Sequence, residues 1–483
     1  MTDDFLPLHL PPLQSPLPIS PIKRRDFLKR SMAAGAASLA PVALGAATPH
    51  QVFKGSSLHI ATFRFDVTPP KGHSLCGGWI KPVVDYDDPL EAIGYVLLGA
   101  GQPVVFCVVD WAGILNEAHL KWRSVLAEAA GTTPERVALH CVHQHNTPLV
   151  CFDAERRLAK QGDLPRSFEM DFQRTCLDRA RTTVSEAVKK ARPATHVAFG
   201  SGVVDKVAGN RRMARDARGH VTAMRGSACK DPALVAMPEG PIDPNLRTIA
   251  FYDRGTKVVA CHFYATHPMS YYGDGRVSSD FCGLARRRRQ ADEPGCTHLY
   301  FTGCAGNIAA GKYNDGSPAA RVELTRRMYE GIVASEARLR PEPLDTIEWR
   351  VEELHPAPNP ALGIGALEEL MMKRRDAIAL RMRPAFKLAW IARCERRVPL
   401  VLGALHMNDI SSLYLPSEPF IEYQLRAQKM TGRFLAVAAY GDNGAWYLPT
   451  KVEYPSGGYE VDFAFCSDAT DDLLMGAMRS LLA

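Results

Sequence analysis

Two histidines separated by a single residue are the first candidates for chemistry in this chain. His143 and His145 lie between the apolar run at residues 136–142 and the polar turn at residues 146–148. We predict that the apolar run is a buried strand, and because residues i and i+2 of a strand share a face, the two imidazoles would project together. Imidazole is the commonest metal ligand in proteins, so the pair predicts half of a metal site, with simple packing as the alternative.

A third histidine and a glutamate follow other apolar runs. His267 comes directly after the predicted strand at residues 257–265 and precedes Pro268, which places it in a turn at a sheet edge, where sites are usually assembled. Glu418 opens a helical run that extends through Tyr423. A carboxylate there suits a metal, but it also suits the positive end of a helix dipole, so both interpretations stay open.

An arginine and two tyrosines are candidates for contacts with a substrate. Arg211 lies in a loop bounded by glycine, and Tyr447 and Tyr459 lie in a C-terminal segment rich in glycine and proline. The plainer alternatives are a solvated arginine and two aromatic rings that only pack.

The elements that must position these side chains are predicted to be short strands that alternate with longer helices. The strands are continuous apolar runs that end in polar or small residues: residues 104–109, 257–265 and 298–302. The helices are amphipathic: residues 117–130, 168–191, 319–339, 365–383 and 470–482. Continuously apolar strands indicate sheets covered on both faces, so we predict an α/β fold with central mixed β-sheets flanked by helices. We find no internal repeat.

The composition limits the broad class of protein. With 483 residues, 46% of them hydrophobic and 23% charged, the chain can bury one large core or two ordinary ones. A net charge of +6 is too small to predict nucleic-acid binding. The twelve cysteines are scattered without a C-x-x-C pair, which favours buried free thiols, with one or two disulfides left open.

The N-terminal segment is predicted to be an export signal. Arg24 and Arg25 form a twin-arginine pattern, followed by a mildly apolar stretch at residues 31–44 and by small residues that suit a signal peptidase. We therefore predict a twin-arginine signal peptide over residues 1–47, the twin-arginine export machinery as a partner, and a periplasmic or secreted protein. No later stretch approaches the ~18 uninterrupted apolar residues of a spanning helix, so no transmembrane helix is expected after signal removal.

Six short motifs occur in the order that characterises one enzyme family. Together they resemble the neutral/alkaline (non-lysosomal) ceramidases, zinc amidases that hydrolyse the N-acyl bond of ceramide. The motifs, as they stand in this sequence, are Asp66-Val67-Thr68-Pro69-Pro70; His143-Gln144-His145-Asn146-Thr147-Pro148; Asn210-Arg211-Arg212; Ala265-Thr266-His267 with residues 277–283; Glu418; and Tyr447, Tyr454 and Tyr459-Glu460. The resemblance covers residues 57–483 and implies a single domain like the N-terminal catalytic domain of that family.

The resemblance also implies roles for individual residues. The ligands of a zinc ion (Zn²⁺) would be His143, His267, Glu418 and Tyr447. The catalytic residues that line the pocket would be His145, Arg211 and Tyr459. A zinc held by mixed nitrogen and oxygen ligands can keep a position for water or substrate. The expected reaction is hydrolysis of an amide or ester bond in a small-molecule or lipid-like substrate by zinc-activated water.

Ala309 is the main departure from the family pattern. The family carries a serine that activity requires at this place in the segment 304–311, and its hydroxyl is missing here. Loss of one hydrogen-bond donor at an acyl-transfer site costs on the order of 10²-fold in rate, so ceramide hydrolysis is expected to be weak or absent. Two alternatives stay open: a metal-binding relative without hydrolysis, and an unrelated exported metallo-phosphoesterase in which His145 and Asp110 or Asp280 surround two metals.

Overall fold

The computed structural model describes residues 53–54, 58–162, 166, 168–373 and 378–483. The chain divides into two units, Met1–Pro49 and His50–Ala483, and all described residues belong to the second. The predicted signal peptide at residues 1–47 therefore lies outside the described residues. Within the described ranges, no helix combines the length and the apolar character that a membrane span requires.

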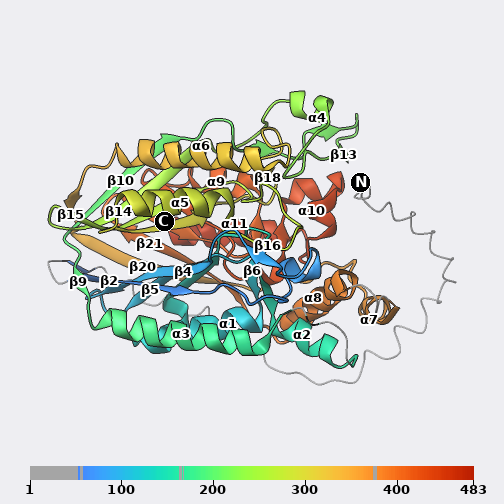
Figure 1. Cartoon of the computed structure of the whole chain (residues 1–483), viewed down its shortest axis with the longest axis horizontal. Coiled ribbons are helices and arrows are strands. Elements are labelled where there is room, and N and C mark those ends of the chain that lie inside the picture. Colours follow the sequence, from blue (N-terminus) through green and yellow to red (C-terminus); the bar gives the residue numbers. More distant parts are fainter. Residues whose placement is uncertain (1–52, 55–57, 163–165, 167, 374–377) are drawn as a thin grey trace, which may run out of the picture. The chain divides into compact units, whose positions relative to one another are not determined.

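Three five-stranded sheets form the framework of the second unit (Figure 1). The first sheet has the strand order β7 (Val137–Cys141), β5 (Val104–Val109), β4 (Glu91–Leu98), β2 (His59–Asp66) and β9 (Arg192–Pro193). The second sheet has the order β17 (Thr297–Thr302), β15 (Thr256–Tyr264), β14 (Asn245–Asp253), β10 (His196–Val203) and β19 (Glu342–Pro343). The third sheet has the order β24 (Phe434–Ala438), β22 (Ile410–Tyr414), β21 (Leu400–Met407), β20 (Thr346–Leu354) and β1 (Phe53–Lys54).

The three sheets share one topology, which the sequence did not reveal. In each sheet the central strands pair antiparallel, and one edge strand pairs parallel with its neighbour: β5 with β7, β15 with β17, and β22 with β24. A helix connects each parallel pair: α1 (Glu117–Ala130), α5 (Asp280–Asp292) and α9 (Ile421–Ala427). The chain therefore repeats a topology without repeating a sequence. Strand pairing is made by backbone groups, so the same topology forms from many apolar sequences and leaves no sequence period.

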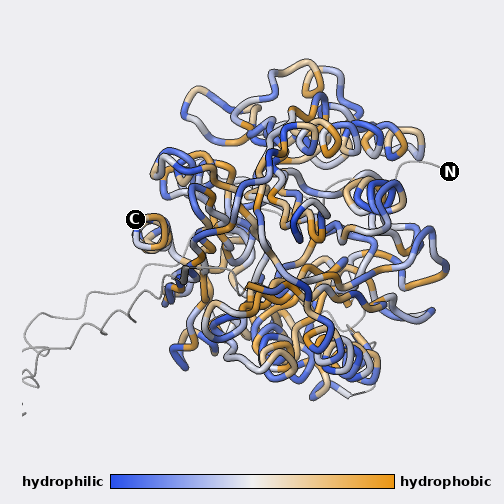
Figure 2. Tube along the Cα trace, turned by 90° about the vertical axis from the view of Figure 1, so that its left-hand side faces the viewer, coloured by the Kyte–Doolittle hydropathy of each residue, from blue (hydrophilic) through white to orange (hydrophobic). Residues whose placement is uncertain are grey.

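Long helices cover the outer faces of the sheets. In Figure 1, α3 (Met170–Val188) lies with α1 below the first sheet, and α6 (Pro318–Glu336) lies with α5 above the second. In the third sheet, α11 (Thr470–Leu482) packs on β20 and β21. These helices carry hydrophilic and hydrophobic residues in alternation along the trace (Figure 2). The predicted α/β fold, with central mixed β-sheets flanked by helices, is confirmed.

One predicted helix differs from the structure. The run at residues 365–383 was expected to be a single helix, whereas the structure has α7 (Ile364–Lys373) and α8 (Ile378–Glu395), which pack against each other. Phe386 and Trp390 are buried, and burial of these rings extends α8 beyond the predicted end.

Short elements occupy the loops between the sheets. The short strand pairs are β6 (Gly113–Leu115) with β8 (Leu149–Cys151), β23 (Glu418–Pro419) with β25 (Tyr447–Leu448), β11 (Gly209–Asn210) with β18 (Ile308–Ala309), β12 (Ala214–Arg215) with β13 (Val221–Ala223), and β3 (Asp85–Tyr86) with β16 (Arg276–Val277). The short helices are α2 (Phe152–Ala159), α4 (Pro232–Ala236) and α10 (Tyr459–Asp462).

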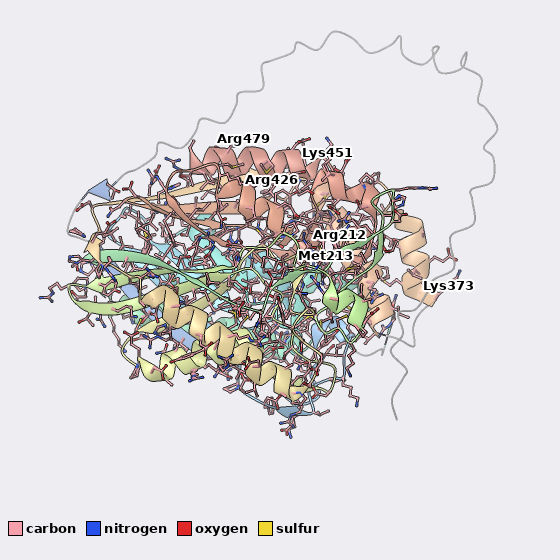
Figure 3. The ribbon with its side chains drawn as sticks, turned by 90° about the horizontal axis from the view of Figure 1, so that it is seen from above. Arg212, Met213, Lys373, Arg426, Lys451 and Arg479 are labelled. Carbon is pink, nitrogen blue, oxygen red and sulfur yellow. The ribbon has the colours of Figure 1, made fainter. Side chains whose placement is uncertain are left out.

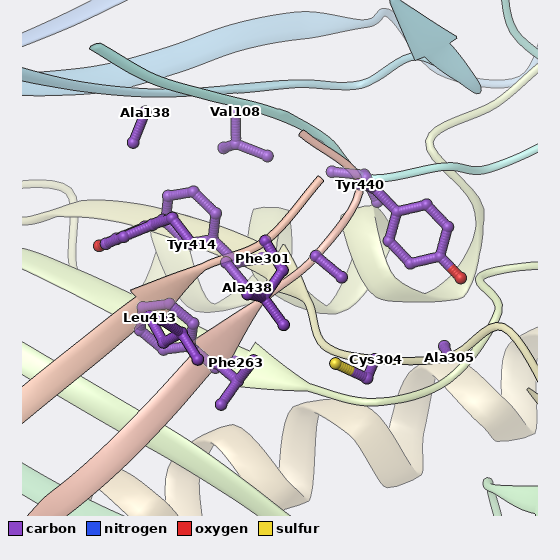
Figure 4. Packing of buried hydrophobic residues seen from close by; sticks show 14 of the residues in the cluster. Val108, Ala138, Phe263, Phe301, Cys304, Ala305, Leu413, Tyr414, Ala438 and Tyr440 are labelled. Carbon is purple, nitrogen blue, oxygen red and sulfur yellow. The ribbon is translucent and has the colours of Figure 1, made fainter. Parts of the chain in front are cut away.

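The three sheets contribute to one hydrophobic core. Val108 of the first sheet, Phe263 and Phe301 of the second and Tyr414 of the third belong to the same buried cluster (Figure 4). All twelve cysteines lie in the described ranges and are unpaired, and ten of them are buried. The expectation of buried free thiols is confirmed.

Candidate functional site

The candidate site lies at the ends of the parallel strand pairs, one pair in each of the three sheets. Loops that follow the parallel pairs carry His143 after β7, His267 after β15, and Glu418 after β22. The carboxyl ends of two parallel strands lie at the same edge of a sheet, and ligands typically bind at such an edge. Three sheets thus each contribute one of these side chains to one place.

His143 adopts a conformation that the strand pattern did not predict. Strand β7 ends at Cys141, and His143 has a φ of 76°, in the left-handed region that non-glycine residues rarely occupy. Its N–H donates to the Trp111 carbonyl at 2.9 Å. The prediction that His143 and His145 share a strand face is therefore wrong. The turn nevertheless brings their Nε2 atoms to 3.4 Å.

Glu418 also differs from its predicted context. It belongs to β23, and α9 begins only at Ile421, so its carboxylate does not cap a helix. In the parallel pair of β23 and β25, Glu418 lies opposite Tyr447. Opposite residues of paired strands point to the same side, which places the carboxylate and the phenol on one side of the pair.

Three lone pairs converge at the centre of the site. The Glu418 Oε2 atom lies 3.3 Å from His143 Nε2 and 3.4 Å from His267 Nε2. All three side chains are buried, and among the described residues neither Glu418 Oε2 nor His267 Nε2 has a hydrogen-bond partner. Buried acceptors without a donor are costly, so the arrangement is compatible with a cation between them.

Backbone carbonyls fix which nitrogen of each ligand histidine carries the proton. The Nδ1–H of His143 donates to the Ala112 carbonyl at 2.5 Å, and the Nδ1–H of His267 donates to the Ala305 carbonyl at 2.7 Å. A carbonyl can only accept, so both Nε2 atoms carry lone pairs. Metal-binding histidines are typically oriented in this way, through the nitrogen that does not touch the metal.

Burial keeps the imidazoles of His145 and His267 neutral. Burial, together with the nearby Arg211 guanidinium, lowers the pKa of His267 to about 4. Burial and the neighbouring His143 hold the pKa of His145 well below its usual range. Neutral imidazole is the form that binds metals.

Arg211 is buried in the site, which excludes the alternative of a solvated arginine. Its Nε–H donates to Glu460 at 2.8 Å, and its terminal N–H groups donate to the Gly306 carbonyl at 2.6 Å and the Tyr447 hydroxyl oxygen at 2.9 Å. Arg212 also donates to Glu460 at 2.6 Å, and Figure 3 shows Arg212 inside the molecule, with Lys373 at its periphery. Burial raises the pKa of Tyr447 well above its usual range, and Arg211 opposes this shift.

The structure places His145 and Tyr447 differently with respect to the three lone pairs. One ring nitrogen from each of His143, His145 and His267 lies within 4.8 Å of the other two, and atoms at this spacing can share a metal ion. The Tyr447 oxygen accepts from Arg211, and its ring centre lies 6.4 Å from that of His267. His145 is therefore close enough to His143 and His267 to join them in a metal site.

A pocket of about 260 Å³ opens onto these groups. Six of the seven predicted site residues line it, and the seventh, His267, lies 3.4 Å from the lining residue Glu418. Tyr459 is the most exposed of them, at 41%. The remaining wall is mainly apolar and aromatic, and it includes Trp79, Leu149, Met269 and Trp446.

The residues of the two-metal alternative lie in other surroundings. Asp110 accepts a hydrogen bond from the Glu91 N–H and lies 3.6 Å from Arg286, and Asp280 accepts hydrogen bonds from Ser270. Neither carboxylate belongs to the histidine group. The structure therefore gives no support to a phosphoesterase centre built from His145 with Asp110 or Asp280.

Sequence reasoning missed Tyr440. Its ring stacks on His143 with 4.3 Å between ring centres, and its hydroxyl is buried without a partner among the described residues. Its φ is 62°, and it lies two residues after β24, as His143 lies two residues after β7. Strained residues of this kind concentrate at functional sites. Only an alignment of the three sheets in space could have identified it.

Comparisons with known proteins bear on the fold. No protein-family model matches the sequence, and no curated protein matches it. Among solved structures, one described as a ceramidase complexed with C2 matches with a TM-score of 0.67 and 16% identity, covering 89% of this chain and 75% of that chain. Neutral ceramidase from Pseudomonas aeruginosa matches with a TM-score of 0.66 and 17% identity, covering 88% of this chain and 75% of that one. The chain has a neutral ceramidase-like fold.

Proposed function

We propose that this chain is a zinc-dependent hydrolase that cleaves an amide bond, or a related ester bond, in a lipid-like substrate. One observation carries the proposal: His143 Nε2, His267 Nε2 and Glu418 Oε2 converge at a pocket with apolar walls, and neither His267 Nε2 nor Glu418 Oε2 has a hydrogen-bond partner among the described residues. Two imidazoles and a carboxylate are a typical ligand set of catalytic zinc. The likeness to neutral ceramidase structures supports the reaction class.

We assign the remaining residues by what they contact. His143, His267 and Glu418 would hold the ion, which leaves His145 and Tyr447 to act on the water and the substrate. Zinc, when bound there, would polarise the scissile carbonyl and lower the pKa of water toward ~7.

The chain's own groups would orient the substrate and move the protons. The Tyr447 oxygen accepts from Arg211, so its O–H is free to donate to a substrate oxygen. The neutral imidazole of His145 lines the pocket and is placed to accept a proton from the attacking water. Tyr459 would contact the substrate at the more exposed side of the pocket.

A substrate panel with and without chelator tests this function. Purified protein would be assayed with N-acyl amides of increasing chain length, with matched esters, and with an aryl phosphodiester. We expect hydrolysis of an amide or ester that is lost on chelation and restored by zinc. Phosphodiester hydrolysis alone would contradict the proposal, and tight zinc binding without any hydrolysis would favour the non-catalytic metal-binding relative.

Ala309 allows a test of substrate choice. It lies in β18, is buried, and pairs with Gly209. We expect weak or absent ceramide hydrolysis in the wild type. The rate should rise on the order of tenfold in Ala309→Ser, because the new hydroxyl supplies a hydrogen-bond donor that the site lacks. Ala310→Ser is the matched control, since it adds the same group one residue away. Equal rates in both variants, or fast ceramide hydrolysis by the wild type, would refute the importance of position 309.

Export is a separate proposal that rests on the N-terminal sequence. The pattern at Arg24 and Arg25 is typical of twin-arginine signals. The double variant Arg24→Lys, Arg25→Lys should accumulate in the cytoplasm, measured by cell fractionation. Unchanged export of that variant would exclude the twin-arginine route.

A further inference from the structure

A second group of potential ligands lies at the start of β17, away from the candidate site. Glu293, Cys296 and His298 each place one ligand atom within 4.8 Å of the other two. Strand β17 separates this group from the loop that carries Ala305, and its length spans roughly 15–20 Å. We propose that Glu293, Cys296 and His298 form a second cation site that takes Zn²⁺ or a similar borderline-soft divalent ion.

A chain of hydrogen bonds determines the tautomer of His298. The Ser335 hydroxyl donates to the Ile332 carbonyl at 2.8 Å, so it accepts from the Thr248 hydroxyl at 2.5 Å. The Thr248 oxygen must then accept from Nδ1–H of His262 at 2.9 Å. That leaves Nε2 of His262 to accept from Nδ1–H of His298 at 3.0 Å. The Nε2 atom of His298 therefore carries a lone pair.

This lone pair has no donor and faces a carboxylate. The His298 side chain is 0% exposed, its Nε2 has no hydrogen-bond partner among the described residues, and it lies 3.4 Å from Glu293 Oε2. A buried acceptor without a donor, 3.4 Å from a carboxylate oxygen, favours a cation between the two. The bond from His298 to His262 is the kind that orients a metal-binding imidazole.

The local sequence suits a chelate. Cys296 and His298 are two residues apart where the chain enters β17, so their side chains can share a face. Glu293 follows α5 and is partly exposed, which gives an ion a path from solvent. A thiolate, an imidazole and a carboxylate form a ligand set that zinc accepts. Binding would release the Cys296 thiol proton to solvent.

Two basic side chains compete with the ion. Lys257 lies 2.8 Å from Glu293 and 2.6 Å from Glu336, and Arg289 donates to Glu293 at 2.6 Å. An incoming ion must displace both Lys257 and Arg289 from Glu293, and Glu336, which pairs with both, can keep the two basic groups. Lys257 thus lowers the affinity of the site.

Cobalt binding tests the second site directly. The wild-type chain loaded with Co²⁺ should bind two ions and show a thiolate-to-cobalt charge-transfer band. We expect Cys296→Ser to lose the band and to bind one ion fewer. Glu293→Gln, a change at a partly exposed position, should lower the affinity for that ion by at least tenfold. Cys394→Ser is the matched control for a cysteine outside both sites and should keep the band. Absence of the band in the wild type, or its persistence in Cys296→Ser, would overturn the proposal.

Two further variants separate this site from the proposed active site. Lys257→Met should raise the affinity of the second site for its ion on the order of tenfold, because the positive charge of the lysine no longer repels the cation. Unchanged affinity in this variant would contradict the placement of the ion beside Glu293. His267→Ala should lose the other ion and keep the charge-transfer band, so either site can fail without the other.

Discussion

Replacing His267 with alanine should remove the active-site metal and reduce hydrolysis by on the order of 10³-fold or more, because a Lewis acid worth several kcal/mol of transition-state stabilisation is lost. The substitution deletes one of three converging acceptors and leaves Glu418 with His143 alone. Bound zinc would be measured by elemental analysis after gel filtration, and the rate with the best substrate of the panel.

A matched control separates loss of the metal from loss of a buried imidazole. His406 is also buried and bonds to Ser411 and to the Leu481 carbonyl in the third sheet. His406→Asn should keep the active-site ion and its rate. If His267→Ala retained its zinc, the ligand assignment would be wrong.

Replacing Arg211 with methionine should both destabilise the protein and slow the reaction. The buried guanidinium bonds to Glu460, Gly306 and Tyr447, so its loss leaves the Glu460 charge with Arg212 as its main partner. Breaking a buried ion pair costs about 3 kcal/mol, and loss of support for a hydrogen-bond donor at the reaction centre costs on the order of 10²-fold in kcat. Urea unfolding and steady-state kinetics measure the two effects.

Arg215 provides the control for the Arg211 variant. It is 31% exposed and pairs with Glu453 at the surface. Arg215→Met should change the free energy of unfolding by no more than about 1 kcal/mol and leave kcat unchanged. A double-mutant cycle of Arg211→Met with Glu460→Gln should give a coupling of about 1–3 kcal/mol. Absence of coupling would show that the buried ion pair does not hold Arg211 in place.

Several elements could be predicted because their signal is local. The helices Glu117–Ala130 and Thr470–Leu482 and the strand Val104–Val109 occur where their apolar patterns predict them. The periodicity of apolar residues is a pattern over a few neighbouring positions, and the sequence shows it directly. The helix expected at residues 365–383 failed because its continuation through Phe386 and Trp390 depends on tertiary burial.

The sequence predicted which residues belong to the candidate site, but it did not predict how they are arranged. One pocket is lined by His143, His145, Arg211, Glu418, Tyr447 and Tyr459, and His267 contacts Glu418. The strand argument for His143 and His145 failed because a left-handed residue replaces the last part of the strand. Tyr440 carried no signal, since a lone tyrosine after an apolar run is usually packing.

By itself the sequence determined the α/β class, the residue types available for metal chemistry and the order of motifs that resembles the ceramidases. Only the tertiary structure decided that one turn from each of three similar sheets meets at one point, that Arg211 is buried against Glu460, and that the lone pairs of His143, His267 and Glu418 face one another. The reason is physical: local patterns fix burial and periodicity, whereas the distance between side chains more than a hundred residues apart depends on strand register and on turns that only the packed sheets impose.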